Sequence, residues 1–155
     1  MTFTEVSGSS SWFGRGYVTY ANEAKMDEVG VTDSVLLQHG AVSAQTVCQM
    51  ASGARSRARA TYALAVSGIA GPTGGTAEKP VGTVHFGLAT PEGTYHRHVH
   101  YRLADRGLVR AGTAYTALAM LLWFLEERLG DHQVTGPYAD EDVFAESGVS
   151  LKVED

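Results

Sequence analysis

The chain has few of the features that would place a protein outside the reducing interior of a cell. It contains one cysteine, Cys48, in 155 residues, which excludes an internal disulfide framework and suits a reducing compartment. No run approaches the ~20 consecutive apolar residues of a membrane span, and no basic-then-apolar signal opens the chain. We therefore expect a cytoplasmic protein that does not enter the membrane.

Excess positive charge is also missing. The formal net charge is −5, and it is unevenly distributed. Residues 1–130 contain eleven basic and ten acidic residues, whereas residues 131–155 contain seven acidic residues and one lysine. A nucleic-acid-binding protein would need a basic face. No nucleic-acid partner is expected.

Length and composition predict one domain with a substantial core. Hydrophobic residues make up 44% of the chain and charged residues 19%, as in ordinary globular proteins. We assign residues 1–130 to this domain. Residues 131–155 form an acidic tail interrupted by Gly136-Pro137, which we expect to be loosely ordered.

Strand-like and helix-like segments alternate along the domain. The pattern predicts strands at 16–20 and 62–66, a hairpin formed by 81–89 and 94–103, helices at 23–29 and 44–60 with a short helical piece before Gly40, and a long helix after Asp105. Asn22, Ser43 and Asp105 are the expected N-caps. Such alternation favours an α/β fold, a layered sandwich in which helices flank a mixed β-sheet.

A glycine-rich stretch, Ser67 to Val84, lies between two apolar runs. It contains five glycines and two prolines, a density that excludes a regular core element. Glycines let backbone N–H groups approach an anion closely, and Ser67, Thr73, Thr76 and Lys79 would add hydroxyl donors and one positive charge. It is not a P-loop, because no Gly-Lys-Ser/Thr follows. A long hairpin connection remains the alternative.

Two further sets of residues could carry chemistry. Tyr20, Asn22 and Lys25 fall at a predicted strand-to-helix junction, where a partly desolvated lysine can act as a general base; the alternative is an ordinary exposed lysine. The second set is Asp105, Arg106 and Arg110 at the start of the last helix, where an arginine is usually solvated or salt-bridged.

Three histidines, His96, His98 and His100, share one face of a predicted strand because side chains alternate along it. Their separation of ~7 Å along a strand is awkward for three ligands of one ion. We expect an exposed, pH-sensitive strand face and no metal, and a structural role for His85.

Four stretches together resemble the CinA C-terminal domain family of competence/damage-inducible proteins and nicotinamide-mononucleotide amidohydrolases. They are the glycine-rich stretch, Val18-Thr-Tyr-Ala-Asn-Glu-Ala-Lys25, Gln38-His-Gly-Ala-Val-Ser43 and the helix start at Asp105-Arg106. The resemblance runs from about Gly8 to Leu129. It implies hydrolysis of nicotinamide mononucleotide to nicotinate mononucleotide and ammonia.

The resemblance also implies roles for particular residues. Tyr20 and Lys25 would assist catalysis. The expected substrate-binding residues are Asn22, Ser67, Gly68, Gly71, Gly74, Gly75, Thr76 and Arg110. The substrate would be a small nucleotide, with no cofactor and no metal. Trp12, Phe13 and an open sheet edge would favour a homo-oligomer.

One part of the family pattern does not occur in the chain. Family members carry an Ala-Glu-Ser-Cys-Thr-Gly-Gly turn that supplies the nucleophilic serine, and Met1 falls after the position of that turn. Ser7, Ser9, Ser10 and Ser11 correspond to a later Gly-Ser-Ser stretch. We therefore expect the given chain to be catalytically impaired. The alternative is a non-catalytic relative that binds nucleotides or oligomerises.

Overall fold

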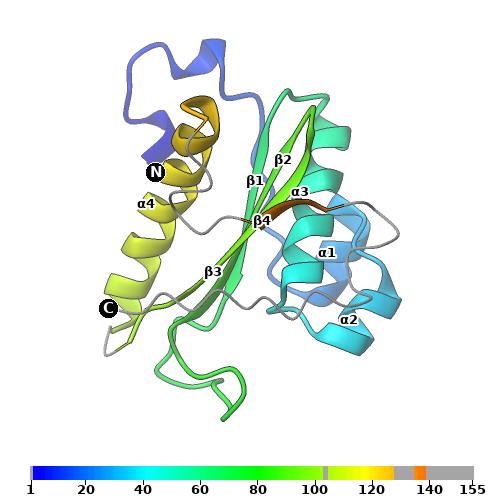
Figure 1. Cartoon of the computed structure of the whole chain (residues 1–155), viewed down its shortest axis with the longest axis vertical. Helices are drawn as coiled ribbons and strands as arrows, with labels where there is room; N and C mark the ends of the chain where they lie inside the picture. The colour runs from blue at the N-terminus through cyan, green and yellow to red at the C-terminus, as the bar shows by residue number, and fades with distance from the viewer. Residues whose placement is uncertain (1, 103–104, 128–134, 139–155) are drawn as a thin grey trace.

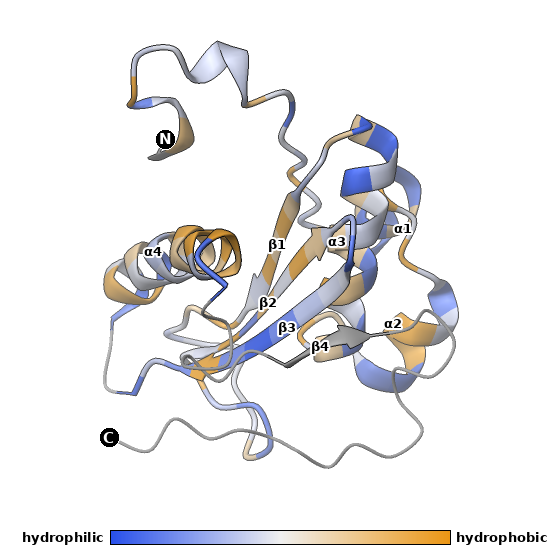
Figure 2. Cartoon of the chain, turned by 45° about the horizontal axis from the view of Figure 1, so that its top comes forward, coloured by the Kyte–Doolittle hydropathy of each residue, from blue (hydrophilic) through white to orange (hydrophobic). Residues whose placement is uncertain are grey.

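A computed structural model of the chain describes residues 2–102, 105–127 and 135–138. A four-stranded sheet forms the middle of three layers, with α4 on one face and α1, α2 and α3 on the other (Figures 1 and 2). The elements are η1 (Thr2–Thr4), η2 (Ser9–Ser11), α1 (Asn22–Val29), α2 (Asp33–His39), α3 (Ala44–Ala58), β1 (Ala63–Gly68), β2 (Thr83–Thr90), β3 (Gly93–His100), α4 (Arg106–Leu125) and β4 (Thr135–Tyr138). The expected α/β layered fold is confirmed.

The sheet has the strand order β1-β2-β3-β4. Every pairing among the described strands is antiparallel, so these residues do not form the mixed sheet that we expected. Phe86 pairs with Val66 on one side and Arg97 on the other. The predicted hairpin is present, and its turn is held by a hydrogen bond from Glu92 N–H to Thr90 Oγ1 of 3.0 Å.

Helix ends follow the local sequence closely. The Ser43 hydroxyl accepts a hydrogen bond from Thr46 N–H, and the Asp105 carboxylate accepts one from Leu108 N–H, as expected of N-caps. Gly30 ends α1 in the left-handed region at φ 71°. Asn22 is not the N-cap of α1: Ala21 takes that position, and Asn22 begins the helix.

The predicted strand at 16–20 is wrong. These residues are extended but pair with no strand among the described residues. Val18 and Tyr20 are 86% and 90% exposed. Strand-forming residues supply local preference, but a strand also needs a neighbour to accept its backbone hydrogen bonds.

Part of the expected tail belongs to the sheet. Residues 135–138 form β4, which pairs with β3, so the expectation of loose order does not hold for these four residues. Residues 131–134 and 139–155 lie outside the described part of the chain.

Each face of the sheet has its own core. Toward α3 the buried residues include Val47, Met50, Ala51 and Ala89. A Cβ at Gly87 would lie 2.5 Å from the Val47 carbonyl oxygen, so α3 packs directly on the backbone of β2. This close approach leaves no space between α3 and the sheet.

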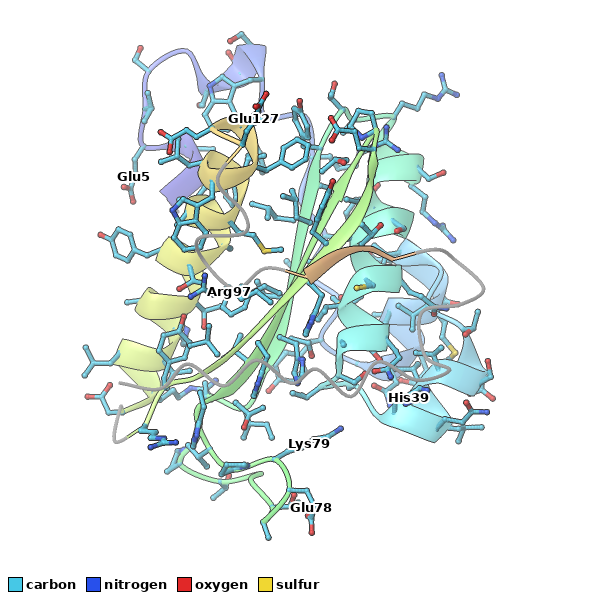
Figure 3. The ribbon with its side chains drawn as sticks, in the orientation of Figure 1. Glu5, His39, Glu78, Lys79, Arg97 and Glu127 are labelled. Atoms are coloured by element: carbon cyan, nitrogen blue, oxygen red, sulfur yellow. The ribbon has the colours of Figure 1, made fainter. Side chains whose placement is uncertain are left out.

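Toward α4 the core includes Phe86, Leu88, Val109 and Met120. At one side of the helix the Arg97 guanidinium lies 4.9 Å from the centre of the Trp123 ring, a cation–π contact between β3 and α4 (Figure 3).

The α4 helix is unusually apolar for a helix with so little burial. By length and composition it could cross a membrane, yet only 17% of its most apolar window is buried. Figure 2 shows hydrophobic residues around α4 rather than only on its sheet-facing side. From the sequence we expected no such segment, because no run approaches ~20 consecutive apolar residues.

Candidate functional site

An apolar cleft of about 430 Å³ lies between β1 and α4, within the size range of small-molecule sites. Arg110 is the one charged residue in its lining, and Thr113 adds a hydroxyl. The lining consists of Phe3, Leu64, Val66, Gly68, Ala70, Val84, Val109, Arg110, Thr113, Ala114, Ala117 and Leu118. The cleft can therefore hold an apolar ring with an anionic group near Arg110.

The glycine-rich stretch continues from the end of β1 as a loop, and backbone hydrogen bonds join the two ends of this loop. Ile69 N–H donates to Thr83 O at 2.9 Å, and Gly82 N–H donates to Ile69 O at 2.7 Å. Gly68 is required by close packing, since a Cβ there would lie 2.7 Å from a methyl group of Val84. Gly71 combines a φ of 77° with a Cβ position 2.5 Å from Val81. At these two positions glycine serves packing and backbone geometry.

The loop tip is exposed and bonded to itself. Thr76 N–H donates to Lys79 O at 2.9 Å, and Lys79 N–H donates to the Thr76 hydroxyl at 3.1 Å. The Thr76 hydrogen-bonding groups are thus used within the turn. Gly74 and Gly75 lie beside it, and Figure 3 shows Glu78 pointing away from the body of the protein.

Three side chains tie the loop to the two helical layers. Lys79 Nζ donates to His39 O at the end of α2 (2.7 Å; Figure 3). Arg106 Nη1 donates to Gly71 O from the start of α4 (3.0 Å). The Ser67 hydroxyl, which we expected to contact substrate, donates to Ala41 O at 2.7 Å. The loop is therefore fixed from both faces of the sheet.

Lys25 is held by the backbone before α1. Its side chain is only 6% exposed, and Nζ donates to the carbonyl oxygens of Thr19, Tyr20 and Ala21 at 2.8, 3.1 and 3.5 Å. Burial lowers the pKa of Lys25 from its usual 10.5, whereas the three carbonyls stabilise the protonated amine. The exposed Tyr20 ring does not join it in a buried pair.

The histidine face is covered rather than exposed. His85 Nδ1 lies 3.0 Å from His96 Nε2, and the His85 ring stacks on His98 with centroids 4.6 Å apart. Burial, with repulsion from His96, His98 and Lys79, lowers the pKa of His85 to about 3. Burial and His98 lower that of His96 to about 4. No cluster suited to a metal ion occurs among the described residues.

Neither Cys48 nor Ser67 has the surroundings of a nucleophile. Cys48 is buried in α3, and burial raises its pKa to about 12, so the thiol stays protonated at neutral pH. Ser67 donates its hydroxyl hydrogen to a backbone carbonyl.

The structure brings together only part of the predicted site. Gly68 and Arg110 line the cleft, and Gly71 is linked to α4 through Arg106. Tyr20, Asn22 and Lys25 lie outside the lining of the cleft. Sequence reasoning omitted the apolar walls supplied by β1; the alternation of Leu64, Val66 and Gly68 was the available signal.

The family model for the CinA C-terminal domain matches residues 1–125. The chain belongs to this family. The match includes Lys25, the glycine-rich loop and Arg110.

Two relatives show how the domain occurs elsewhere. The chain is 50% identical over 124 residues to the nicotinamide-nucleotide amidohydrolase PncC of Escherichia coli (strain K12), covering 79% of this chain and 75% of that protein. It is 48% identical over 122 residues to a CinA-like protein of Syntrophus aciditrophicus (strain SB), covering 79% of this chain but only 29% of that longer protein.

Solved structures share the fold. The competence/damage inducible protein CihA from Agrobacterium tumefaciens matches with a TM-score of 0.75 and 50% identity, over 77% of this chain and 73% of that one. A CinA superfamily protein from Escherichia coli gives a TM-score of 0.74 at 33% identity, over 77% and 69% of the two chains.

Proposed function

We propose that the chain is a nicotinamide-nucleotide amidohydrolase domain that acts on nicotinamide mononucleotide. The observation that carries the proposal is the 50% identity to an enzyme named for this activity over 124 residues. We further propose that this activity belongs to the salvage of nicotinamide nucleotides in the cytoplasm.

The cleft suits this substrate class. Its apolar walls can accept a pyridine ring, and Arg110 offers forked donors to a phosphate. Arg106 is already bonded to Gly71 O, so it positions the loop beside the cleft. We therefore assign phosphate binding to Arg110 and loop positioning to Arg106.

Turnover requires a nucleophile that bonds to the carboxamide carbon, so that the protonated nitrogen leaves as ammonia, and water then hydrolyses the acyl intermediate to free the nucleophile. The motif Ala-Glu-Ser-Cys-Thr-Gly-Gly does not occur in the 155 residues, and Cys48 and Ser67 are unsuited to the task. We propose that the 155-residue chain binds the nucleotide but hydrolyses it very slowly. Loss of a catalytic nucleophile costs ~10⁶-fold in a comparable enzyme.

A second candidate function is nucleotide binding without catalysis. The hydrogen bonds from Lys25 to three carbonyls favour it, because a lysine held in this way stabilises the chain entry into α1 rather than accepting a proton. Fusion of the missing motif distinguishes the two candidates.

The test measures ammonia release and nucleotide binding in parallel. The 155-residue chain should bind nicotinamide mononucleotide with little release, and a fusion with a family-type segment carrying the motif should restore release. Arg110→Ala should weaken binding at least about tenfold, the effect of ~1.4 kcal/mol, whereas exposed Arg57→Ala on α3 should leave it unchanged. A fusion that binds but stays inactive would support the non-catalytic candidate.

Lys25→Met separates a catalytic from a structural role in the fused protein. A catalytic lysine predicts loss of turnover with a small change in the unfolding free energy. A structural lysine predicts a loss of about 1–3 kcal/mol, because three part-buried carbonyls lose a charged donor. Urea unfolding and single-turnover rates, measured on the same samples, assign the role.

A further inference from the structure

The solvent-facing side of α4 carries an apolar stripe with coiled-coil spacing. Its members recur at alternating steps of three and four residues, as in a heptad seam. They are Leu108, Ala111, Tyr115, Leu118, Leu122 and Leu125. Four of its large members, Leu108, Tyr115, Leu122 and Leu125, are 52–73% exposed. A helix packed on a sheet normally carries polar residues on this side.

We propose that this stripe binds the same stripe of a second copy of the chain, with the two α4 helices antiparallel. In an antiparallel pair, residues whose numbers have the same sum face each other across the two-fold axis. Leu108 then meets Leu125, Ala111 meets Leu122, and Tyr115 meets Leu118. Every contact pairs two apolar side chains, and the small Ala111 leaves room for Leu122.

Charge at the two ends of α4 favours the antiparallel arrangement. The start of the helix has Asp105, Arg106 and Arg110, a net charge of +1. The end has Glu126 and Glu127, and with Arg128 next in sequence the net charge is −1; Figure 3 shows Glu127 at the end of α4 far from the glycine-rich loop. The helix dipole adds to this difference, because it is positive at the start of the helix and negative at its end. Antiparallel pairing places unlike ends together, whereas parallel pairing places like ends together.

The second copy would also border the cleft. Leu118 belongs to the stripe and lines the cleft between β1 and α4. A helix seated on the stripe therefore stands beside the cleft mouth, so association limits the sides from which a ligand enters.

The first experiment measures the mass of the 155-residue protein in solution by light scattering and sedimentation. The expected result is twice the 16.5 kDa of one chain. Tyr115→Glu, next to the two-fold axis, should reduce it to that of one chain while circular dichroism stays unchanged. Leu37→Glu, a matched change at a 78%-exposed leucine of α2, should leave the dimer intact. A monomeric wild type, or a dimer that survives Tyr115→Glu, would overturn the proposal.

Cysteine cross-linking tests the orientation without relying on a destabilising variant. A disulfide needs Cα atoms within ~7 Å, and residues 108 and 125 are about 25 Å apart along one helix. Leu108→Cys mixed with Leu125→Cys should form covalent dimers on mild oxidation, and either variant alone should not. Cross-linking of Leu108→Cys alone would overturn the antiparallel arrangement.

A lipid surface is the competing occupant of so apolar a helix. Flotation with vesicles of phosphatidylcholine and phosphatidylglycerol distinguishes it. The dimer should remain in the dense fraction. Wild-type chain that floats, with release by Tyr115→Glu, would overturn the proposal in favour of membrane binding.

Discussion

Helices cover both faces of the sheet, but the two faces differ in how closely those helices pack on it. On one face α3 lies directly on the backbone of β2, and α1 and α2 close the layer. On the other face α4 stands away from β1, leaving a cleft of about 430 Å³ and an apolar outer side. The closed face holds the fold together, and the open face has both the space for a ligand and the surface for a partner.

The largest expected effect tests the closed face. A Cβ at Gly53 of α3 would overlap the carbonyl oxygen of Val29, so α1 and α3 would have to separate. Gly53→Ala should lower the free energy of unfolding by about 3 kcal/mol or prevent folding. Gly14→Ala, where a Cβ meets nothing within 4 Å, is the matched control. Urea unfolding of both variants decides; equal stability would show that the face is less tightly packed than described.

The second prediction concerns the loss of folding stability at low pH. The pKa of His85 is lowered to about 3 and that of His96 to about 4, below the ~6.5 of an unfolded chain. Between these values the unfolded state binds more protons, so stability is full above pH 6.5 and falls as the pH drops toward 4. His96→Gln should remove about one proton from this dependence, which urea unfolding at several pH values measures. An unchanged slope for His96→Gln would contradict the half-buried histidine cluster.

The smallest effect tests the open face. Ala114 lines the cleft, so Ala114→Leu should enter empty space and change stability by no more than about 1 kcal/mol, in the stabilising direction. The same change at Ala51, fully buried under α3, should destabilise by about 1–3 kcal/mol. Thermal unfolding of the pair measures the difference between the faces directly. Similar losses at both positions would remove the contrast.

Local chemistry made several elements predictable. Ser43 and Asp105 each accept a hydrogen bond from an N–H three residues later, and Gly30 takes a left-handed conformation at its helix end. These signals depend on neighbours within one turn, so the sequence contains them in full.

Features that depend on distant partners were not predictable in the same way. The 16–20 segment has strand composition but no described partner strand. The 135–138 segment contains Gly136-Pro137 and still pairs with β3. The alternation of His96 and His98 showed that they share a face, but only the position of α3 showed that this face is covered.

The same distinction between local and distant partners applies to the candidate site. Gly68 and Arg110 meet at the cleft because β1 and α4 are brought together by the core around Phe86. Tyr20 and Lys25 are neighbours in sequence, yet the lysine side chain turns to the backbone and the tyrosine ring to solvent. Sequence proximity predicted their vicinity but not the direction of either side chain.

The hydrogen bonds that hold the glycine-rich loop should make its opening slow. Hydrogen bonds close its base at Ile69 and Gly82, Thr76 closes its tip, and Lys79 and Arg106 attach it to opposite layers. Such a loop opens only when several of these bonds break together, so its opening is a rare event compared with the motion of a free hinge. Ligand entry and release should then be governed by the mouth of the cleft. Amide hydrogens at Ile69 and Gly82 should exchange with solvent far more slowly than those of the exposed Gly74.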